Sequence, residues 1–162
     1  VTVRDVKELF AMRSNPEVMK YVPRPLAKTK QDVLTLIETF DTGIRENSFI
    51  NWGITLKEDD QVIGMIGLLR MQPENFRIEV GYLLSPDHHG KGVMAEALKT
   101  VVDYAFDVLK FHSLEAVIDP ANLASERVLQ RAGFVKEAHF IENFYHNGVF
   151  LDTVIYSLIN RR

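Results

Sequence analysis

The sequence predicts a layered α/β (α+β) protein in which helices flank a mixed, mostly antiparallel central sheet. Residues 48–85 read as three successive strands, residues 93–109 repeat apolar side chains with the period of a helix, and residues 113–159 mix strand and helix patterns. Successive strands indicate an antiparallel meander, whereas strands that alternate with helices add parallel neighbours. A mixed sheet therefore follows.

The composition is that of a globular protein with one core. The chain has 162 residues, 46% of them hydrophobic and 25% charged, and a net charge of −3; we expect one domain over residues 1–162. Without a basic block we expect no nucleic-acid partner. The longest apolar run, residues 62–69, is far shorter than the roughly 20 residues that cross a membrane. No signal peptide is visible, although the start at Val1 leaves a removed leader open, and we expect a cytoplasmic protein.

The chain contains no cysteine. Disulfides, thiolate metal sites and a cysteine nucleophile are therefore excluded. His112, His139 and His146 are scattered, and no pair has the spacing of metal ligands on one element. We expect no metal.

The first third of the chain reads as helical. Residues 3–14 carry apolar side chains at helical spacing, and Asn15-Pro16 ends that helix and starts a short turn. The following loop contains two prolines and is not expected to be helical. Thr29 then caps a second helix, with Asp32 at its third position. The apolar stripe of this helix comprises Val33, Leu36, Ile37 and Phe40.

The three strands of the meander follow. Residues 48–57 alternate and end at a charged turn at 58–60, and residues 61–71 form a buried strand whose two glycines mark close backbone approach. Residues 75–85 form the third strand, which Pro86 stops. The three segments read as neighbours in an antiparallel sheet.

The second half begins with the long helix over 93–109, whose apolar stripe we assign to the core. A strand, a helix and another strand follow over 113–119, 122–133 and 134–142. Residues 145–159 close the chain, and Asn147-Gly148 within them is a strong hairpin signal.

The turn between the third strand and the long helix reads His-His-Gly-Lys-Gly, residues 88–92. Amides near 90–94 can point at an anion there, aided by the helix dipole and by the charge of Lys91. The alternative is that the glycines serve only to allow a tight turn, without binding an anion. A Walker A loop is excluded because Gly92 follows the lysine, and a dinucleotide fingerprint lacks its third glycine at Ala95.

This segment resembles motif A of the GNAT acyltransferases, Gln/Arg-x-x-Gly-x-Gly/Ala. His89 stands where Gln or Arg is usual, Gly92 matches, and Met94 replaces the last Gly or Ala, as in the RimJ/RimL-type branch that acetylates ribosomal-protein N-termini. A second motif, Asn-x-x-Ser-x-x-Val-x-x-x-x-Gly-Phe, is similar to Asn122, Ser125, Val128, Gly133 and Phe134. The likeness extends over nearly the whole chain, and it implies a single GNAT acetyltransferase domain with a splayed pair of parallel strands.

The resemblance implies acetyl-CoA as the co-substrate, bound where the parallel strands splay. The amides implied to hold its pyrophosphate are those of His89, Gly90, Lys91, Gly92, Val93 and Met94. Its pantetheine arm is implied to pair with the backbone of Tyr82, Leu83 and Leu84. Asn122, an N-cap by type, and Ser125 are implied to contact the cofactor as well.

The catalytic candidates are Glu79 and Ser125. Glu79, on the strand that leads into the implied cleft, is our candidate base; the alternative is a surface carboxylate or a cross-strand partner of Arg77 or Lys57. Ser125 is implied to donate a proton to the leaving thiolate; the alternative is local bonding to backbone in the first turn of its helix. Without a cysteine, direct attack by the acceptor amine is favoured over an acyl-enzyme.

The implied acceptor is a primary amine, with a ribosomal-protein N-terminus as the namesake substrate of the branch. Small amines, such as amino acids, polyamines or antibiotics, stay open as acceptors. The rival interpretations are a non-catalytic acyl-CoA-binding sensor or interaction domain, and an unrelated phosphate-binding domain. No sequence feature decides whether the chain forms a homodimer. We expect the acceptor to be chosen by residues 19–26, the second helix and residues 143–148.

Overall fold

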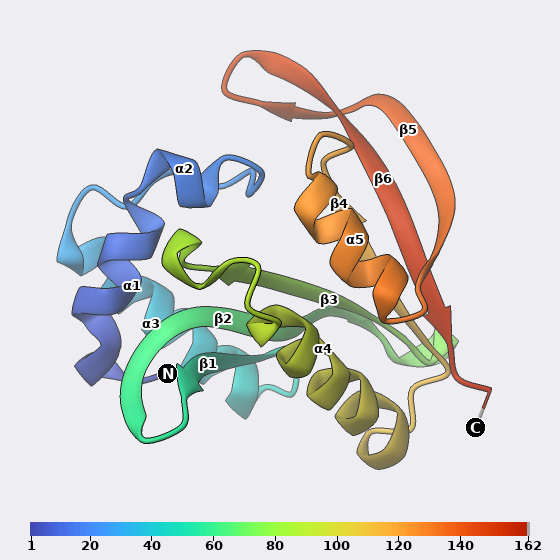
Figure 1. Cartoon of the computed structure of the whole chain (residues 1–162), viewed down its shortest axis with the longest axis horizontal. Helices are drawn as coiled ribbons and strands as arrows, with labels where there is room; N and C mark the ends of the chain where they lie inside the picture. Colours follow the sequence, from blue (N-terminus) through green and yellow to red (C-terminus); the bar gives the residue numbers. More distant parts are fainter. Residues whose placement is uncertain (162) are drawn as a thin grey trace. The chain divides into compact units, whose positions relative to one another are not determined.

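The computed structural model describes residues 1–161, which divide into two compact units. The first unit comprises Val1–Arg70 and Tyr82–Val93, and the second comprises Met71–Gly81 and the chain from Met94 onward. The α-helices are α1 (Val6–Arg13), α2 (Pro16–Met19), α3 (Lys30–Arg45), α4 (Val93–Asp103) and α5 (Leu123–Arg131) (Figure 1). No helix within residues 1–161 is long and apolar enough to span a bilayer.

Six strands form one sheet in the order β1-β2-β3-β4-β6-β5. They are β1 (Ile50–Leu56), β2 (Asp59–Gln72), β3 (Arg77–Leu84), β4 (Ser113–Ile118), β5 (Val135–His146) and β6 (Val149–Ile159). The β3–β4 pair is parallel, whereas β1–β2, β4–β6 and β5–β6 are antiparallel. The predicted mixed, mostly antiparallel sheet is confirmed.

The first unit packs α1 and α3 against β2. Thr29 caps α3 as predicted, because its Oγ1 accepts from the Asp32 amide (3.3 Å) while the Asp32 carboxylate accepts from the Thr29 amide (2.9 Å). The buried side chains of this core are Leu9, Met12, Val33, Ile37, Val62 and Met65. Residues 30–37 thus both start the helix and bring its apolar stripe onto the sheet.

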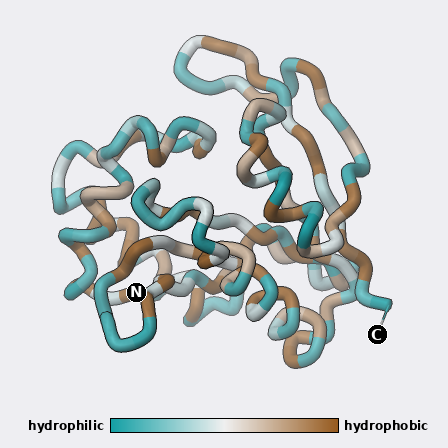
Figure 2. The backbone as a smooth tube through the Cα atoms, in the orientation of Figure 1, coloured by the Kyte–Doolittle hydropathy of each residue, from teal (hydrophilic) through white to brown (hydrophobic). Residues whose placement is uncertain are grey.

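Two local predictions in the first unit differ in detail from the structure. The expected turn after Asn15 is the one-turn helix α2, which begins at Pro16 because the Asn15 side chain accepts from the Glu17 amide (2.9 Å). The charged turn lies at residues 57–58, since Asp59 already pairs with Leu56 in the hairpin. That turn is hydrophilic throughout (Figure 2).

The second unit carries the long β5–β6 hairpin. Asn147 and Gly148 both have positive φ, 50° and 84°, as a two-residue hairpin turn of the primed type requires, so this prediction is confirmed. β5 extends to His146, beyond the predicted end at residue 142, because the register shifts at an irregularity instead of breaking. The helix predicted over 93–109 is α4 followed by a π turn, Tyr104–Val108, in which the Leu109 amide donates to the Tyr104 carbonyl (3.1 Å).

Tyr156 of β6 joins this sheet to α5. It is 1% exposed, and its hydroxyl donates to Glu126 Oε1 of α5 (2.5 Å). Burial, with the Glu126 carboxylate, raises the pKa of Tyr156 to about 12. The folded protein therefore favours the neutral hydroxyl, which fixes α5 on β6.

Replacing Tyr156 by phenylalanine should lower the free energy of unfolding by about 1.5–3 kcal/mol, because the hydrogen bond to a carboxylate is lost. The loss should be full below pH 10.0, the ordinary tyrosine pKa, and should shrink as the pH rises toward about 12. Urea unfolding across this range measures both effects, with the exposed Tyr145→Phe as the matched control. Equal stability of the Tyr156→Phe variant and wild type at neutral pH would contradict this assignment.

Candidate active site

The turn from β3 to α4 has positive φ angles at its two glycines, Gly90 and Gly92. Gly90 and Gly92 have φ values of +72° and +80°, and no atom lies within 4 Å of where a Cβ would stand at either position. Such φ values are strained for side-chain-bearing residues, and the open space shows that the glycines do not serve close packing. The turn therefore exposes bare backbone on one side.

The free amides of this turn begin at Gly90. The amides of His88 and His89 donate to Ser85 O and Pro86 O, both at 3.0 Å. No backbone bond of this kind engages the amides of residues 90–92 within the described chain. The helix α4 starts at Val93, so its first amides lack intrahelical acceptors as well. The turn can thus hold an anion with amides from residue 90 onward.

The His89 side chain stabilises the turn through a hydrogen bond that the sequence did not predict. Its ring Nε2 lies 2.9 Å from the carbonyl oxygen of Leu84 and donates a hydrogen bond to it. This bond ties the turn back onto the end of β3. Since the ring binds the Leu84 carbonyl and the His89 amide binds Pro86, His89 shapes the turn with both its side chain and its backbone.

The C-terminal end of β3 lies close to β2. A Cβ on Gly64 would stand 2.8 Å from the Leu83 carbonyl oxygen, so only glycine allows this approach. The close backbone contact predicted for that glycine is confirmed. Leu84 is buried, whereas Tyr82 and Leu83 are half-buried and keep part of their surface accessible.

Glu79 lies in the second unit, in the parallel register of β3 with β4. It is 6% exposed and stands opposite Glu115. The alternative of a surface carboxylate is therefore wrong. The Arg77 guanidinium binds Glu115 Oε2 through Nε (3.1 Å) and through Nη2 (2.5 Å). Arg77 thus compensates the charge of Glu115 beside the candidate base.

The polar contacts continue across the sheet from Arg77. Its Nη2 donates to Ser157 Oγ (3.4 Å), and that hydroxyl donates to Glu137 Oε2 (2.7 Å). Arg77, Glu115, Ser157 and Glu137 thus join β3, β4, β6 and β5. This network fixes the segment of β3 that carries Glu79.

Asn122 and Ser125 lie together at the start of α5. The Asn122 side-chain oxygen accepts from the Ser125 amide (3.1 Å), which confirms the predicted N-cap. Ser125 is 8% exposed. At the other end of the helix Gly133 has φ +89° and Phe134 is buried, so these two motif positions terminate α5 and anchor it.

The remaining histidines do not gather around a metal. Within residues 1–161 no group of three or more His, Asp or Glu side chains is placed to hold an ion. His139 instead pairs with Asp152 (2.7 Å) on the β5–β6 hairpin. The Glu142 amide, with help from His139, lowers the pKa of the Asp152 carboxyl.

Comparison with known proteins agrees with this architecture. The family model described as Acetyltransferase (GNAT) domain matches residues 1–135. YoaA of Bacillus subtilis, an uncharacterized N-acetyltransferase, is 33% identical over 162 residues, which cover 100% of this chain and 92% of that protein.

Two solved structures share the fold. The spermidine N-acetyltransferase from Vibrio cholerae, in complex with CoA and spermine, has a TM-score of 0.85 at 21% identity and covers 98% of this chain and 92% of its own. The ribosomal-protein-S5-alanine acetyltransferase from Vibrio fischeri has a TM-score of 0.87 at 23% identity and covers 99% of this chain and 91% of its own. The family match over most of the chain and the shared fold lead to one conclusion: this protein belongs to the GNAT acetyltransferase family.

Proposed function

We propose that this chain transfers the acetyl group of acetyl-CoA to a primary amine by direct attack, and that the amine is a protein N-terminal α-amine. The family match over residues 1–135 carries the proposal. The bare turn at Gly90 and Gly92 supports it, because free amides at a helix start suit a pyrophosphate.

The co-substrate contacts follow from this turn. Amides from Gly90 to Met94, with the charge of Lys91, would bind the pyrophosphate, and His89 would hold the turn in shape through Leu84. The backbone of Tyr82 and Leu83 would pair with the pantetheine arm. Asn122 and Ser125 would contact the same molecule from the start of α5. The CoA part of the donor is the same whichever amine is acetylated, so backbone amides suit its recognition.

The reaction needs a neutral amine. The amine nitrogen attacks the thioester carbon, the carbon–sulfur bond breaks, and the amine proton leaves to Glu79 directly or through water. The hydroxyl of Ser125 then donates a proton to the thiolate and takes one up from water, while Glu79 releases the amine proton to solvent before the next turnover. Deprotonation at pH 7 costs an α-amine about 1 kcal/mol and a lysine side chain roughly 4.6 kcal/mol, so an N-terminal acceptor needs only a modest base.

A polyamine is the second candidate acceptor. The structural neighbour from Vibrio cholerae is a spermidine N-acetyltransferase bound to spermine, and the net charge of −3 on this chain would attract a polycation. Aliphatic polyamine nitrogens resemble lysine more than an α-amine in basicity. A polyamine acetyltransferase would therefore depend more strongly on its base.

Acetylation of competing acceptors distinguishes an N-terminal α-amine from a polyamine as the substrate. We expect peptides with free Ala or Ser N-termini to be acetylated on the α-nitrogen, with kcat/KM at least about tenfold above spermidine, because their amines cost less to deprotonate. N-terminally blocked lysine peptides serve as the control, and mass spectrometry locates the acetyl group. A preference for spermidine would replace the N-terminal assignment by the polyamine one. Binding of CoA without acetylation of any amine would favour the sensor interpretation.

A further inference from the structure

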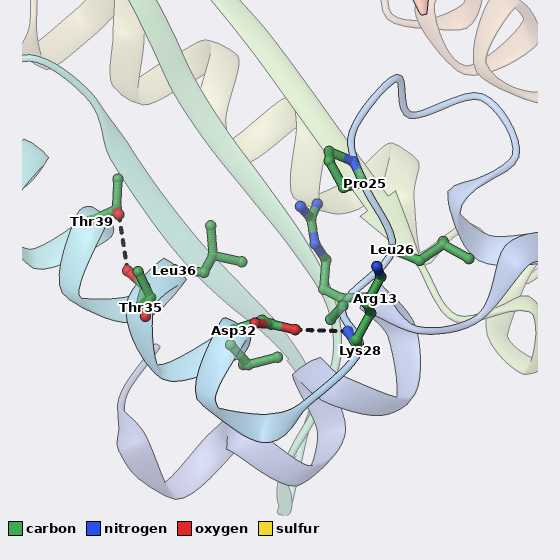
Figure 3. A pocket seen from close by; sticks show the side chains of 10 residues that line it. Arg13, Pro25, Leu26, Lys28, Asp32, Thr35, Leu36 and Thr39 are labelled. Atoms are coloured by element: carbon green, nitrogen blue, oxygen red, sulfur yellow. Dashed lines mark hydrogen bonds between the residues drawn. The ribbon is translucent and has the colours of Figure 1, made fainter. Parts of the chain in front are cut away.

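A cavity of about 440 Å³ lies entirely within the first unit, between α1, α3 and the loop that leads into α3. Figure 3 shows the Arg13 side chain extending from α1 between Asp32 of α3 and the loop that carries Pro25. The lining residues that matter below are Arg13, Leu26, Lys28, Asp32, Thr35 and Leu36. None of them belongs to the β3–α4 turn or to the other residues proposed above to bind acetyl-CoA.

Arg13 has no partner for its charge among residues 1–161. Its side chain is half-buried and forms no hydrogen bond or ion pair with any described residue. Its carbonyl oxygen accepts from the Ala27 amide (3.0 Å), which folds the loop against α1 beside the guanidinium. Burial, and then the like charge of Arg24, lower the pKa of Arg13. A partly desolvated cation next to a second cation is unfavourable unless an anion joins them.

We propose that this cavity is a binding site for a small organic anion, whose carboxylate or phosphate is held by Arg13 and Lys28. A guanidinium offers a planar fork that matches either group, and Lys28 contributes a second positive charge from the cavity wall. Arg24 adds to the positive potential from the exposed loop beside it. The anion would relieve the repulsion between Arg13 and Arg24.

The rest of the lining restricts which anions fit. Asp32 is already fixed, because its Oδ2 accepts from the amides of Thr29 (2.9 Å) and Lys28 (2.8 Å), and these bonds lower the pKa of its carboxyl. Figure 3 shows the bond from Lys28. An ionised carboxylate in the wall disfavours polyanions and favours a ligand with a hydroxyl or amino donor near its acidic group. Leu26 and Leu36 supply apolar surface for a short carbon chain. Small hydroxy acids and sugar-type phosphates satisfy these conditions.

Calorimetric titration of the full chain with two probes, glycerate and glycerol 3-phosphate, tests the proposal and tells a carboxylate ligand from a phosphate ligand. We expect saturable binding of at least one probe, with Kd raised at least about tenfold in Arg13→Gln. Arg4→Gln removes the same charge from an exposed site of the same unit and should leave Kd within about twofold. If Arg13→Gln does not fold, Lys28→Gln on the exposed loop should raise Kd at least about threefold.

Gly92→Glu separates this site from the proposed CoA site. Probe binding that survives Gly92→Glu and weakens in Arg13→Gln supports the proposal, whether or not the chain binds CoA. Probe binding that survives Arg13→Gln or Lys28→Gln but is lost in Gly92→Glu would place the anion at the β3–α4 turn and overturn the proposal. Failure of both probes to bind saturably would overturn it as well.

Discussion

Replacing Glu79 by glutamine is expected to lower kcat by about 10²–10⁴-fold, the usual contribution of a general base. The variant keeps the size of the side chain and a hydrogen-bonding oxygen but cannot accept the amine proton at neutral pH. Because Glu79 is 6% exposed on a strand fixed by the Arg77 network, the substitution should leave KM for acetyl-CoA nearly unchanged. Steady-state thiol release, with the acetyl-CoA concentration varied at saturating amine, measures both constants.

The pH dependence distinguishes a base from a structural carboxylate. In wild type, kcat/KM should fall at acid pH as Glu79 and the amine take up protons; in Glu79→Gln only the protonation of the amine should remain. Glu74→Gln is the matched control, since Glu74 lies in the exposed turn just before the same strand. A decrease in kcat of less than about threefold, with an unchanged pH profile, would exclude Glu79 as the base.

Gly92→Glu should raise the Kd for CoA at least about 100-fold. The substitution puts a carboxylate where the pyrophosphate is proposed to lie, and like charges in contact cost several kcal/mol. It also forces a side-chain-bearing residue to a φ of +80°. Isothermal titration of CoA into the wild type and the variant gives the ratio.

Gly148→Glu controls for the backbone effect. Gly148 has a φ of +84° and equally open surroundings, but it lies at the tip of the β5–β6 hairpin. This variant should carry the same backbone strain and bind CoA with nearly the wild-type Kd. Equal CoA affinity in wild type and Gly92→Glu would show that the pyrophosphate does not bind at this turn.

Local sequence patterns predicted the parts of the fold that short-range chemistry determines. Thr29 with Asp32, Asn122 before α5 and Asn147-Gly148 each form the cap or turn expected of them, because their hydrogen bonds and φ angles involve neighbours within a few residues. The exact hairpin turn before Asp59 was missed, because strand pairing rather than composition decides where it lies.

The contacts around the candidate site depend on residues far apart in sequence. Glu79 next to Glu115, and the bonds from Arg77 to Glu115, follow only from the parallel register of β3 and β4. The bond from the His89 ring to the Leu84 carbonyl depends on how the turn folds back. Motif matching could name His89 and strand position could name Glu79, but neither gave the partners that define their surroundings.

The most direct test of acetyl transfer is the release of CoA thiol from acetyl-CoA in the presence and absence of an amine. The account predicts release that depends on both enzyme and amine, matched one to one by acetylated acceptor. Release that is the same with and without amine would contradict direct transfer and indicate hydrolysis. No release with any α-amine, polyamine or lysine acceptor, in a preparation that does not bind CoA, would contradict the assignment as a whole.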